Sequence, residues 1–316
     1  MKKLLIFFLL IIFLSLTIIY SFIRSNISVS VFATVRGTRS GIDSCLHNIQ
    51  KWKSWWPSAD VKELAAGDSF YTYNNNSYWL SKKFSDGAAI EIQGEDKNIA
   101  SQIQSVPKNN DTLFIQWTAL VPAGFNPVER VRSYFKARSL QEDMKTIFKN
   151  LYDYAQHPEN IYGFDVYRTT FTDTTLIAKR FAGTGSATTE DIYKNIAQLK
   201  EYIARQGAVE KDVPMLNISY AKDSSYEAMI AICVDKALPS SGEFFLRRMV
   251  PMKDRFLACE VQGGPFLIQQ AHRAVEKYMF DNSLSAPAIP FELIVTDRSR
   301  ETDTTKWITR IFYPSM

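Results

Sequence analysis

The sequence predicts an α+β protein in which one transmembrane helix precedes two domains built on antiparallel sheets. Three observations favour this class. The chain begins with a long apolar segment at residues 4–22, short alternating segments separated by Asn, Gly, Asp and Pro follow, and the second half places an amphipathic helix twice among such segments. A length of 316 residues suits about two domains of ordinary size.

The composition excludes several classes of protein. The chain is 46% hydrophobic with 13 Gly, 12 Pro and 3 Cys, which excludes collagen-like, disordered and disulfide-scaffold proteins. Lys and Arg total 37 against 33 Asp and Glu, and without Lys2, Lys3 and Arg24 the totals are 34 and 33. A nearly neutral body offers no positive surface to a phosphate backbone, so we expect no nucleic-acid partner.

The uncharged segment at residues 4–22 predicts a membrane anchor within residues 1–26. At about 1.5 Å per residue this helix would span roughly 28 Å, close to the thickness of a bilayer core. A cleaved signal peptide is the alternative, but its apolar core is about 7–15 residues long and a small-residue cleavage site follows it. Residues 20–24 contain no such site. We expect a single-pass protein with its body on the non-cytoplasmic side, because Lys2 and Lys3 favour a cytoplasmic start.

The first domain is expected over residues 27–158. An alternating strand covers residues 28–35, a short helical stretch ends near Pro57, and a meander of strands continues to residue 120. One long amphipathic helix follows. Its apolar stripe consists of Leu140, Met144, Ile147, Leu151 and Ala155. Pro158 ends this unit, because proline and the residue before it resist helix continuation.

The second domain, expected over residues 159–316, contains an internal repeat. Each copy reads strand, glycine turn, helix, strand, strand, and the copies cover about residues 174–235 and 254–314. Helices are expected at residues 189–205 and 266–282. Each copy has one helix for a three-stranded sheet, so its second face needs cover from the other copy, and a groove between the two halves follows.

The second half resembles the GyrI-like effector-binding domain of gyrase-inhibitor proteins and of AraC-type and MerR-type regulators. The resemblance rests on the paired β-α-β-β units, on Val261-Gln-Gly-Gly-Pro-Phe266, and on the segments at 290–297 and 307–314, and it runs from about Tyr162 to the C-terminus. It implies a duplicated β-α-β-β fold with a groove for a small molecule. The candidate ligand-binding residues are Phe181, Glu260, Phe266, Trp307 and Arg310.

One position departs from this family's pattern. Many GyrI-like domains carry a glutamate on the last strand, just before three hydrophobic residues and a proline, where this chain has Arg310. An arginine repels cations and pairs well with a carboxylate or a phosphate. Pairing between Glu260 and Arg310 themselves is the alternative, and it would leave neither side chain for a ligand.

The first half resembles the START-like (SRPBCC, polyketide-cyclase-like) helix-grip fold from about Ile27 to His157. The initial strand, the short helix that leads to Trp52-Lys-Ser-Trp-Trp-Pro57, the meander that ends near Trp117 and the long helix carry this resemblance. It implies a curved antiparallel sheet around the long helix and an apolar cavity. The candidate lining residues are Trp55, Trp56, Trp79 and Trp117, for which a packed aromatic core is the alternative.

The sequence carries no signature of a metal site or a nucleotide cofactor. Gly183-Thr-Gly185 lacks the third glycine of a dinucleotide motif and is better explained as a strand-to-helix turn. The cysteines and histidines show no ligand spacing, and a hydrogen-bonded pair is the simplest account of His272 and Glu276, four residues apart on one helix. We therefore expect no metal and no cofactor, with Cys45, Cys233 and Cys259 as buried apolar residues. A disulfide between the last two is the alternative.

These patterns predict a non-enzymatic, membrane-anchored protein that senses or sequesters an amphipathic small molecule. Two alternatives remain open. In the first, the chain is a hydrolase of the GyrI-like type, with Glu260 or Glu292 as general base in a dry groove. In the second, the body is a partner-docking module that binds no ligand, which a tightly packed interior without cavities would favour.

Overall fold

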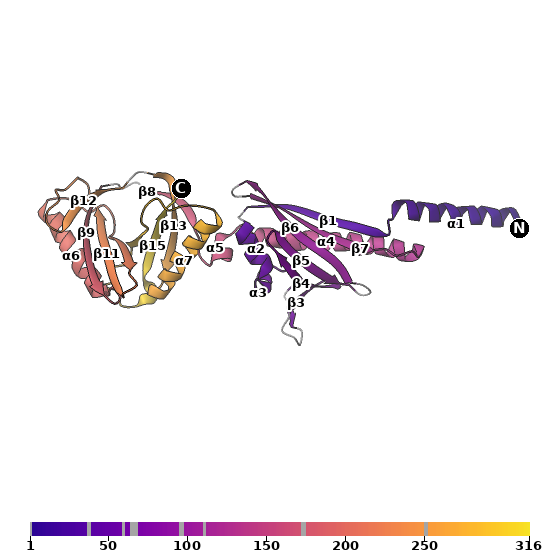
Figure 1. Ribbon diagram of the computed structural model, residues 1–316, viewed down its shortest axis with the longest axis horizontal. Helices are drawn as coiled ribbons and strands as arrows, with labels where there is room; N and C mark the ends of the chain where they lie inside the picture. Colours follow the sequence, from indigo (N-terminus) through magenta and orange to yellow (C-terminus); the bar gives the residue numbers. More distant parts are fainter. Residues whose placement is uncertain are drawn as a thin grey trace. The chain divides into compact units, whose positions relative to one another are not determined.

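The computed structural model describes residues 2–36, 39–58, 61–63, 69–94, 98–109, 112–171, 175–249 and 252–316 (Figure 1). The chain divides into two compact units, Met1–His157 and Pro158–Met316. The elements of the first unit are α1 Lys2–Phe22, β1 Asn26–Arg36, α2 Arg39–His47, α3 Ile49–Trp52, β2 Val61–Glu63, β3 Ser69–Tyr73, β4 Asn76–Phe84, β5 Gly87–Gln93, β6 Asn98–Asn109, β7 Thr112–Pro122 and α4 Pro127–Ala155.

The second unit is also built from helices and antiparallel strands. Its elements are α5 Pro158–Tyr162, β8 Tyr167–Phe171, β9 Thr175–Thr184, α6 Thr189–Arg205, β10 Met215–Tyr220, β11 Ser225–Cys233, β12 Phe244–Arg248, β13 Met252–Gln262, α7 Pro265–Asp281, β14 Phe291–Ile294, the 3-10 turn Thr304–Lys306 and β15 Ile308–Pro314. Both units thus combine helices with one antiparallel sheet, as the α+β prediction requires.

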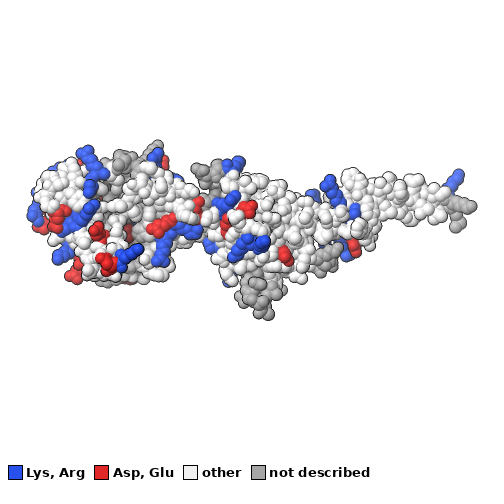
Figure 2. Space-filling view, viewed as in Figure 1, with Lys and Arg blue, Asp and Glu red and all other residues white. Residues whose placement is uncertain are grey.

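α1 is the one helix among the described residues that is long and apolar enough to cross a membrane, and none of it is buried. Its surface carries no charged side chain along most of its length (Figure 2). Arg130 of α4 contacts the backbone just after the C-terminal end of α1. Its Nη1 donates to the Ile23 carbonyl at 2.8 Å, and its Nε donates to the Gly124 carbonyl at 3.0 Å. The guanidinium also lies over the Tyr20 ring, 4.3 Å from its centre. A signal sequence near the N-terminus would also meet this criterion of length and composition.

The seven-stranded sheet of the first unit has the order β1-β7-β6-β5-β4-β3-β2, and all of its pairings are antiparallel. α4 packs along one face of it. The helix begins after Asn126, whose side chain accepts a hydrogen bond from the Val128 amide, and it ends just before Pro158. The predicted apolar stripe from Leu140 to Ala155 is buried, as expected.

Aromatic rings form the centre of this core. Trp52 stacks on Trp56 with ring centres 5.2 Å apart, and Trp117 contacts Phe148 of α4 at 5.5 Å. Both Trp52 and Trp117 are fully buried, and each indole NH has an acceptor. Because the rings touch one another, burial of aromatic surface holds this part of the sheet against α4.

The eight-stranded sheet of the second unit has the order β12-β9-β11-β10-β14-β15-β13-β8. β10 and β14 join its two halves at the centre, and two residue pairs, Met215 with Leu293 and Leu216 with Glu292, make this junction. Edge strands β8 and β12 lie outside the predicted repeat. The strands expected at residues 175–181, 215–220, 226–234 and 255–261, and the helices α6 and α7, are present close to their expected bounds.

The sheet of the second unit curls, so that its halves face each other with α6 and α7 outside (Figure 1). α6 covers one half and α7 the other. Hydrophobic clusters lie beneath α6 and beneath α7, and a third hydrophobic cluster lies on the concave side, which has no helix. This third cluster contains residues of both halves, among them Leu176 and Ala178 on β9, Phe256 on β13 and Phe312 on β15. Each half therefore covers the face of the other that has no helix. Cys45, Cys233 and Cys259 are buried and form no disulfide.

Candidate functional site

A groove of about 730 Å³ opens on the helix side of the second unit, above the two central strands. The start of α6, the outer part of β10, the first three turns of α7, and β14 line it. Its apolar walls include Ile192, Leu216, Ile268 and Trp307, while Phe266 stands at its mouth and is 71% exposed. This size lies within the usual range of about 300–1,000 Å³ for small-molecule sites.

Local sequence fixes the start of α7 beside this groove. Gly263 has φ +151°, and a Cβ there would come within 2.4 Å of Leu267 Cδ1, so the turn requires glycine. Pro265 then takes the first helical position, where the missing N–H costs nothing. Two turns later the helix presents His272 toward β14 and β15.

Four side chains form a hydrogen-bonded chain at one side of the groove. His272 Nε2 lies 3.0 Å from Glu292 Oε1, His272 Nδ1 lies 2.9 Å from the Tyr313 hydroxyl, and that hydroxyl donates to Glu276 Oε1 at 3.1 Å. The side chains of His272 and Glu292 are 24% and 17% exposed, while Glu276 lies at the outer edge. α7, β14 and β15 thus bring together residues far apart in the sequence.

The Tyr313 hydroxyl gives its hydrogen to Glu276, so the Tyr313 oxygen is the acceptor that faces His272. Burial and the adjacent Glu276 carboxylate raise the pKa of Tyr313 above its usual range, so its hydroxyl keeps the proton that it donates.

Arg298 lies against the other side of Glu292. Its Nη2 is 2.8 Å from Thr309 Oγ1 and 3.7 Å from Glu292 Oε2, and its guanidinium lies 4.9 Å from the centre of the Trp307 ring. The side chain is only 8% exposed, and Nε is buried without a partner among the described residues. The groove therefore combines apolar walls with a compact set of opposite charges.

The groove contains three of the candidates named from sequence: Phe266, Trp307 and Glu292. Glu260 and Arg310 are cross-strand neighbours on the opposite face of the sheet, and Arg310 Nε donates to Glu260 Oε2 at 2.6 Å. Both are about half exposed, and such a pair stabilises a fold by roughly 0–1 kcal/mol.

The remaining candidates lie elsewhere. Phe181 is half-buried beside the α6 cluster and packs edge to face with Tyr226. Trp55, Trp56 and Trp117 belong to the aromatic core of the first unit, where they contact other rings. Trp79 is half-buried on β4.

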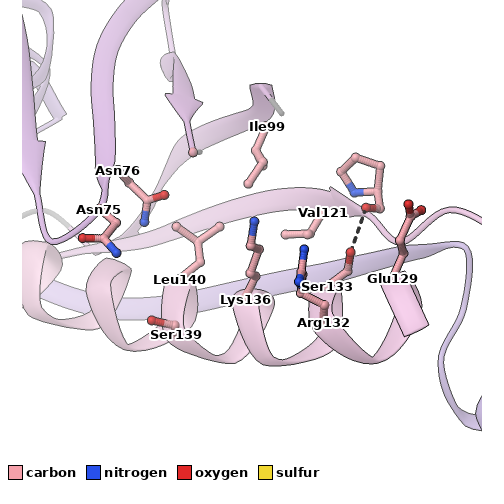
Figure 3. A pocket seen from close by; sticks show the side chains of 12 residues that line it. Asn75, Asn76, Ile99, Val121, Glu129, Arg132, Ser133, Lys136, Ser139 and Leu140 are labelled. Atoms are coloured by element: carbon pink, nitrogen blue, oxygen red, sulfur yellow. Dashed lines mark hydrogen bonds between the residues drawn. The ribbon is translucent and has the colours of Figure 1, made fainter. Parts of the chain in front are cut away.

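The first unit has a hollow of its own, of about 440 Å³, between the first half of α4 and the strand ends above it (Figure 3). Arg132 and Lys136 project from α4 toward Ile99 and Val121, and Glu129 stands beside them. None of the four candidate tryptophans lines it. Its charged side chains have both signs and are exposed, so they define no single ligand chemistry.

Sequence reasoning missed His272, Tyr313 and Arg298 as members of the groove. His272 and Arg298 are isolated polar residues with no motif around them, whereas Tyr313 lies within the segment 307–314, which served only to indicate the fold. The spacing of His272 and Glu276 on one helix face was the available signal, and Tyr313 links this pair instead of a direct bond.

Comparisons with known proteins find only distant likeness. No protein-family model and no curated protein matches the chain. One similar solved structure is the EcmrR–DNA complex, with 14% sequence identity, coverage of 61% of this chain and 72% of that one, and a TM-score of 0.44. Another is the EcmrR C-terminal domain, with 12% identity, coverage of 48% of this chain and 98% of that one, and a TM-score of 0.42. The Aha1 dimer from Colwellia psychrerythraea is a third, with 13% identity, coverage of 41% of this chain and 96% of that one, and a TM-score of 0.32. At these TM-scores no conclusion about function follows.

Proposed function

We propose that this chain binds an amphipathic small molecule in the groove between α6 and α7. The observation that carries the proposal is the set of linked polar side chains, Glu276, Tyr313, His272, Glu292 and Arg298, at the side of a groove that also has apolar walls. Buried ionisable groups are costly, so they concentrate where a site uses them. Apolar walls would hold the body of the ligand, at about 25 cal/mol per Å² of surface removed from water. The charged groups would orient its polar end.

We further propose that α1 anchors the protein in a membrane as a single span, with the body on the non-cytoplasmic side. The apolar length of residues 4–22 and the lysines before it support this topology. In this proposal the first unit is a START-like domain and the second a duplicated GyrI-like domain. Nucleic acid is not among the proposed partners.

The test begins with the full chain, purified gently from its own host into lipid nanodiscs. Native mass spectrometry should detect a co-purified small molecule. Glu292→Gln should weaken its binding about 10- to 100-fold, the range for a hydrogen bond to a charged group. Glu201→Gln is the matched control, because Glu201 pairs with Arg205 on the exposed side of α6. An empty protein whose melting temperature no amphiphile shifts would contradict the proposal.

A hydrolase remains the second candidate, and the 3.0 Å contact between His272 and Glu292 favours it, because this pair can accept and return a proton. Glu292 lies in the groove, whereas Glu260 lies outside it. If a turnover is found, Glu292→Gln should abolish it and Glu260→Gln should not. Unchanged turnover in both variants would exclude these carboxylates as the general base.

A further inference from the structure

A second pocket of about 560 Å³ lies on the concave side of the second unit, and it shares Leu216, Asn217 and Phe291 with the groove described above. Strands β9 to β12, the segment before β14 and the end of β15 line it. Most of the wall is apolar, and it is formed by Leu176, Met215, Met229, Ala231, Phe256 and Phe291. Several of these residues belong to the cluster that the two halves of the sheet share.

Two arginines meet at one side of this pocket. Arg180 of β9 and Arg247 of β12 lie on either side of the register pair Ala178–Phe245 and share its face of the sheet. Their guanidinium carbons are 5.7 Å and 4.9 Å from the centre of the Phe245 ring. The Phe245 ring therefore contacts two cations at the edge of the apolar pocket.

These cations lack the acidic partners that neighbouring cations have. Lys179, the next residue along β9, pairs with Glu243 at 3.0 Å, and Arg310 pairs with Glu260. Among the described residues, neither Arg180 nor Arg247 forms an ion pair, and the described lining includes a third arginine, Arg248, but no Asp or Glu side chain. The site thus has a surplus of positive charge and fixed apolar walls.

The segment at residues 285–289 covers part of the pocket. Ser285 and Met316 exchange both backbone hydrogen bonds at 3.0 Å, which ties this segment to the end of β15. Ile289 lines the pocket and remains 55% exposed. The hollow is therefore covered but still open to solvent.

We propose that this concave pocket binds an amphiphile with an apolar body and one anionic head group, such as a carboxylate or a sulfonate. Two guanidinium groups offer planar pairs of N–H donors, which match the two oxygens of such a head. The apolar wall takes the rest of the molecule. A fatty acid released from a lipid and a soluble aromatic acid both have this chemistry. This site adjoins the groove that contains Glu292, but Glu292 itself does not line it.

Calorimetric titration of the full chain in lipid nanodiscs tests the proposal, with empty nanodiscs as the blank. The probes are 6-phenylhexanoate and 6-phenylhexylammonium, which differ only in the charged head. We expect the carboxylate to bind at least tenfold more tightly than the ammonium. Equal affinity of the two probes would overturn the proposal.

Variants locate the binding site. Arg180→Gln and Arg247→Gln should each weaken 6-phenylhexanoate binding about tenfold, whereas Arg205→Gln on α6 should leave it unchanged. Arg247→Lys keeps the charge but loses the planar donor pair. It replaces the glutamine variant in this test if that variant does not fold. Unchanged affinity in the folded variants at both positions would refute the site.

Two further measurements separate the two sites and the two ligand sources. Glu292→Gln should leave 6-phenylhexanoate binding unchanged, and a loss there would place the anion in the groove and overturn this proposal. Dodecanoate, titrated in parallel, should also bind. Tighter binding of dodecanoate indicates a lipid-derived ligand, and tighter binding of the phenyl acid indicates a soluble aromatic one.

Discussion

Asp43 of α2 offers a test of electrostatics in the first unit. Its side chain is half-buried, and Oδ1 has no hydrogen-bond partner among the described residues. Burial raises the pKa of Asp43 from 3.8 to about 6, while His47 and Arg39 oppose the shift and Asp86 adds to it. Ionised Asp43 therefore destabilises the folded state at neutral pH.

The magnitude follows from the shift in pKa. Two pKa units correspond to about 3 kcal/mol, and solvent screening of a half-buried group reduces this to roughly 1–2 kcal/mol. The folded state binds the Asp43 proton more tightly than the unfolded state does. This contribution to the free energy of unfolding is therefore fully present below pH 3.8 and is lost as the pH rises to about 6.

Asp43→Asn removes this titration. We expect the variant to be more stable than the parent by about 1–2 kcal/mol at pH 7.5, and the two proteins to be equally stable near pH 4. Urea unfolding in detergent micelles measures this difference by tryptophan fluorescence, because five of the six tryptophans lie in the first unit. A variant that is less stable at pH 7.5, or a difference that does not change with pH, would refute the reasoning.

Three other substitutions test packing and backbone geometry. Trp117→Phe should lower the free energy of unfolding by about 2–3 kcal/mol in urea titrations, because it removes a fully buried indole and its hydrogen bond. Gly87→Ala should lower the free energy of unfolding by about 2–4 kcal/mol in the same assay, since φ is +154° and the new Cβ would lie 1.9 Å from the Ile103 carbonyl oxygen. Arg130→Gln should free the end of α1 at Ile23, and trypsin should then cleave between α1 and β1 several times faster.

The elements that sequence predicted best have strong local signals. α6 runs from Thr189 to Arg205 as expected, because its apolar period is regular and Thr188 caps it through the Asp191 amide. Edge strands β8 and β12 escaped prediction. They are short, and pairing with the neighbouring strands β13 and β9, a tertiary interaction, holds them in place.

The site was less predictable than the fold, because pairing between distant segments creates it. His272 and Glu292 are twenty residues apart, and they meet because β14 pairs with β15, against which α7 packs. Composition also could not distinguish a cavity lined by tryptophans from tryptophans that pack on one another. In the first unit Trp55 and Trp56 contact other rings, 5.5 Å and 5.2 Å from the centre of Trp52.

The junction between β10 and β14 has a mechanical consequence. Two residue pairs join the halves of the eight-stranded sheet there, whereas nine join β9 to β11. Under a pulling force this short junction would yield before the longer ladders, since fewer hydrogen bonds share the load. Leu216 and Glu292 of that junction also form part of the groove. A ligand that contacts both strands would therefore act as a clamp, and its departure would soften the middle of the sheet.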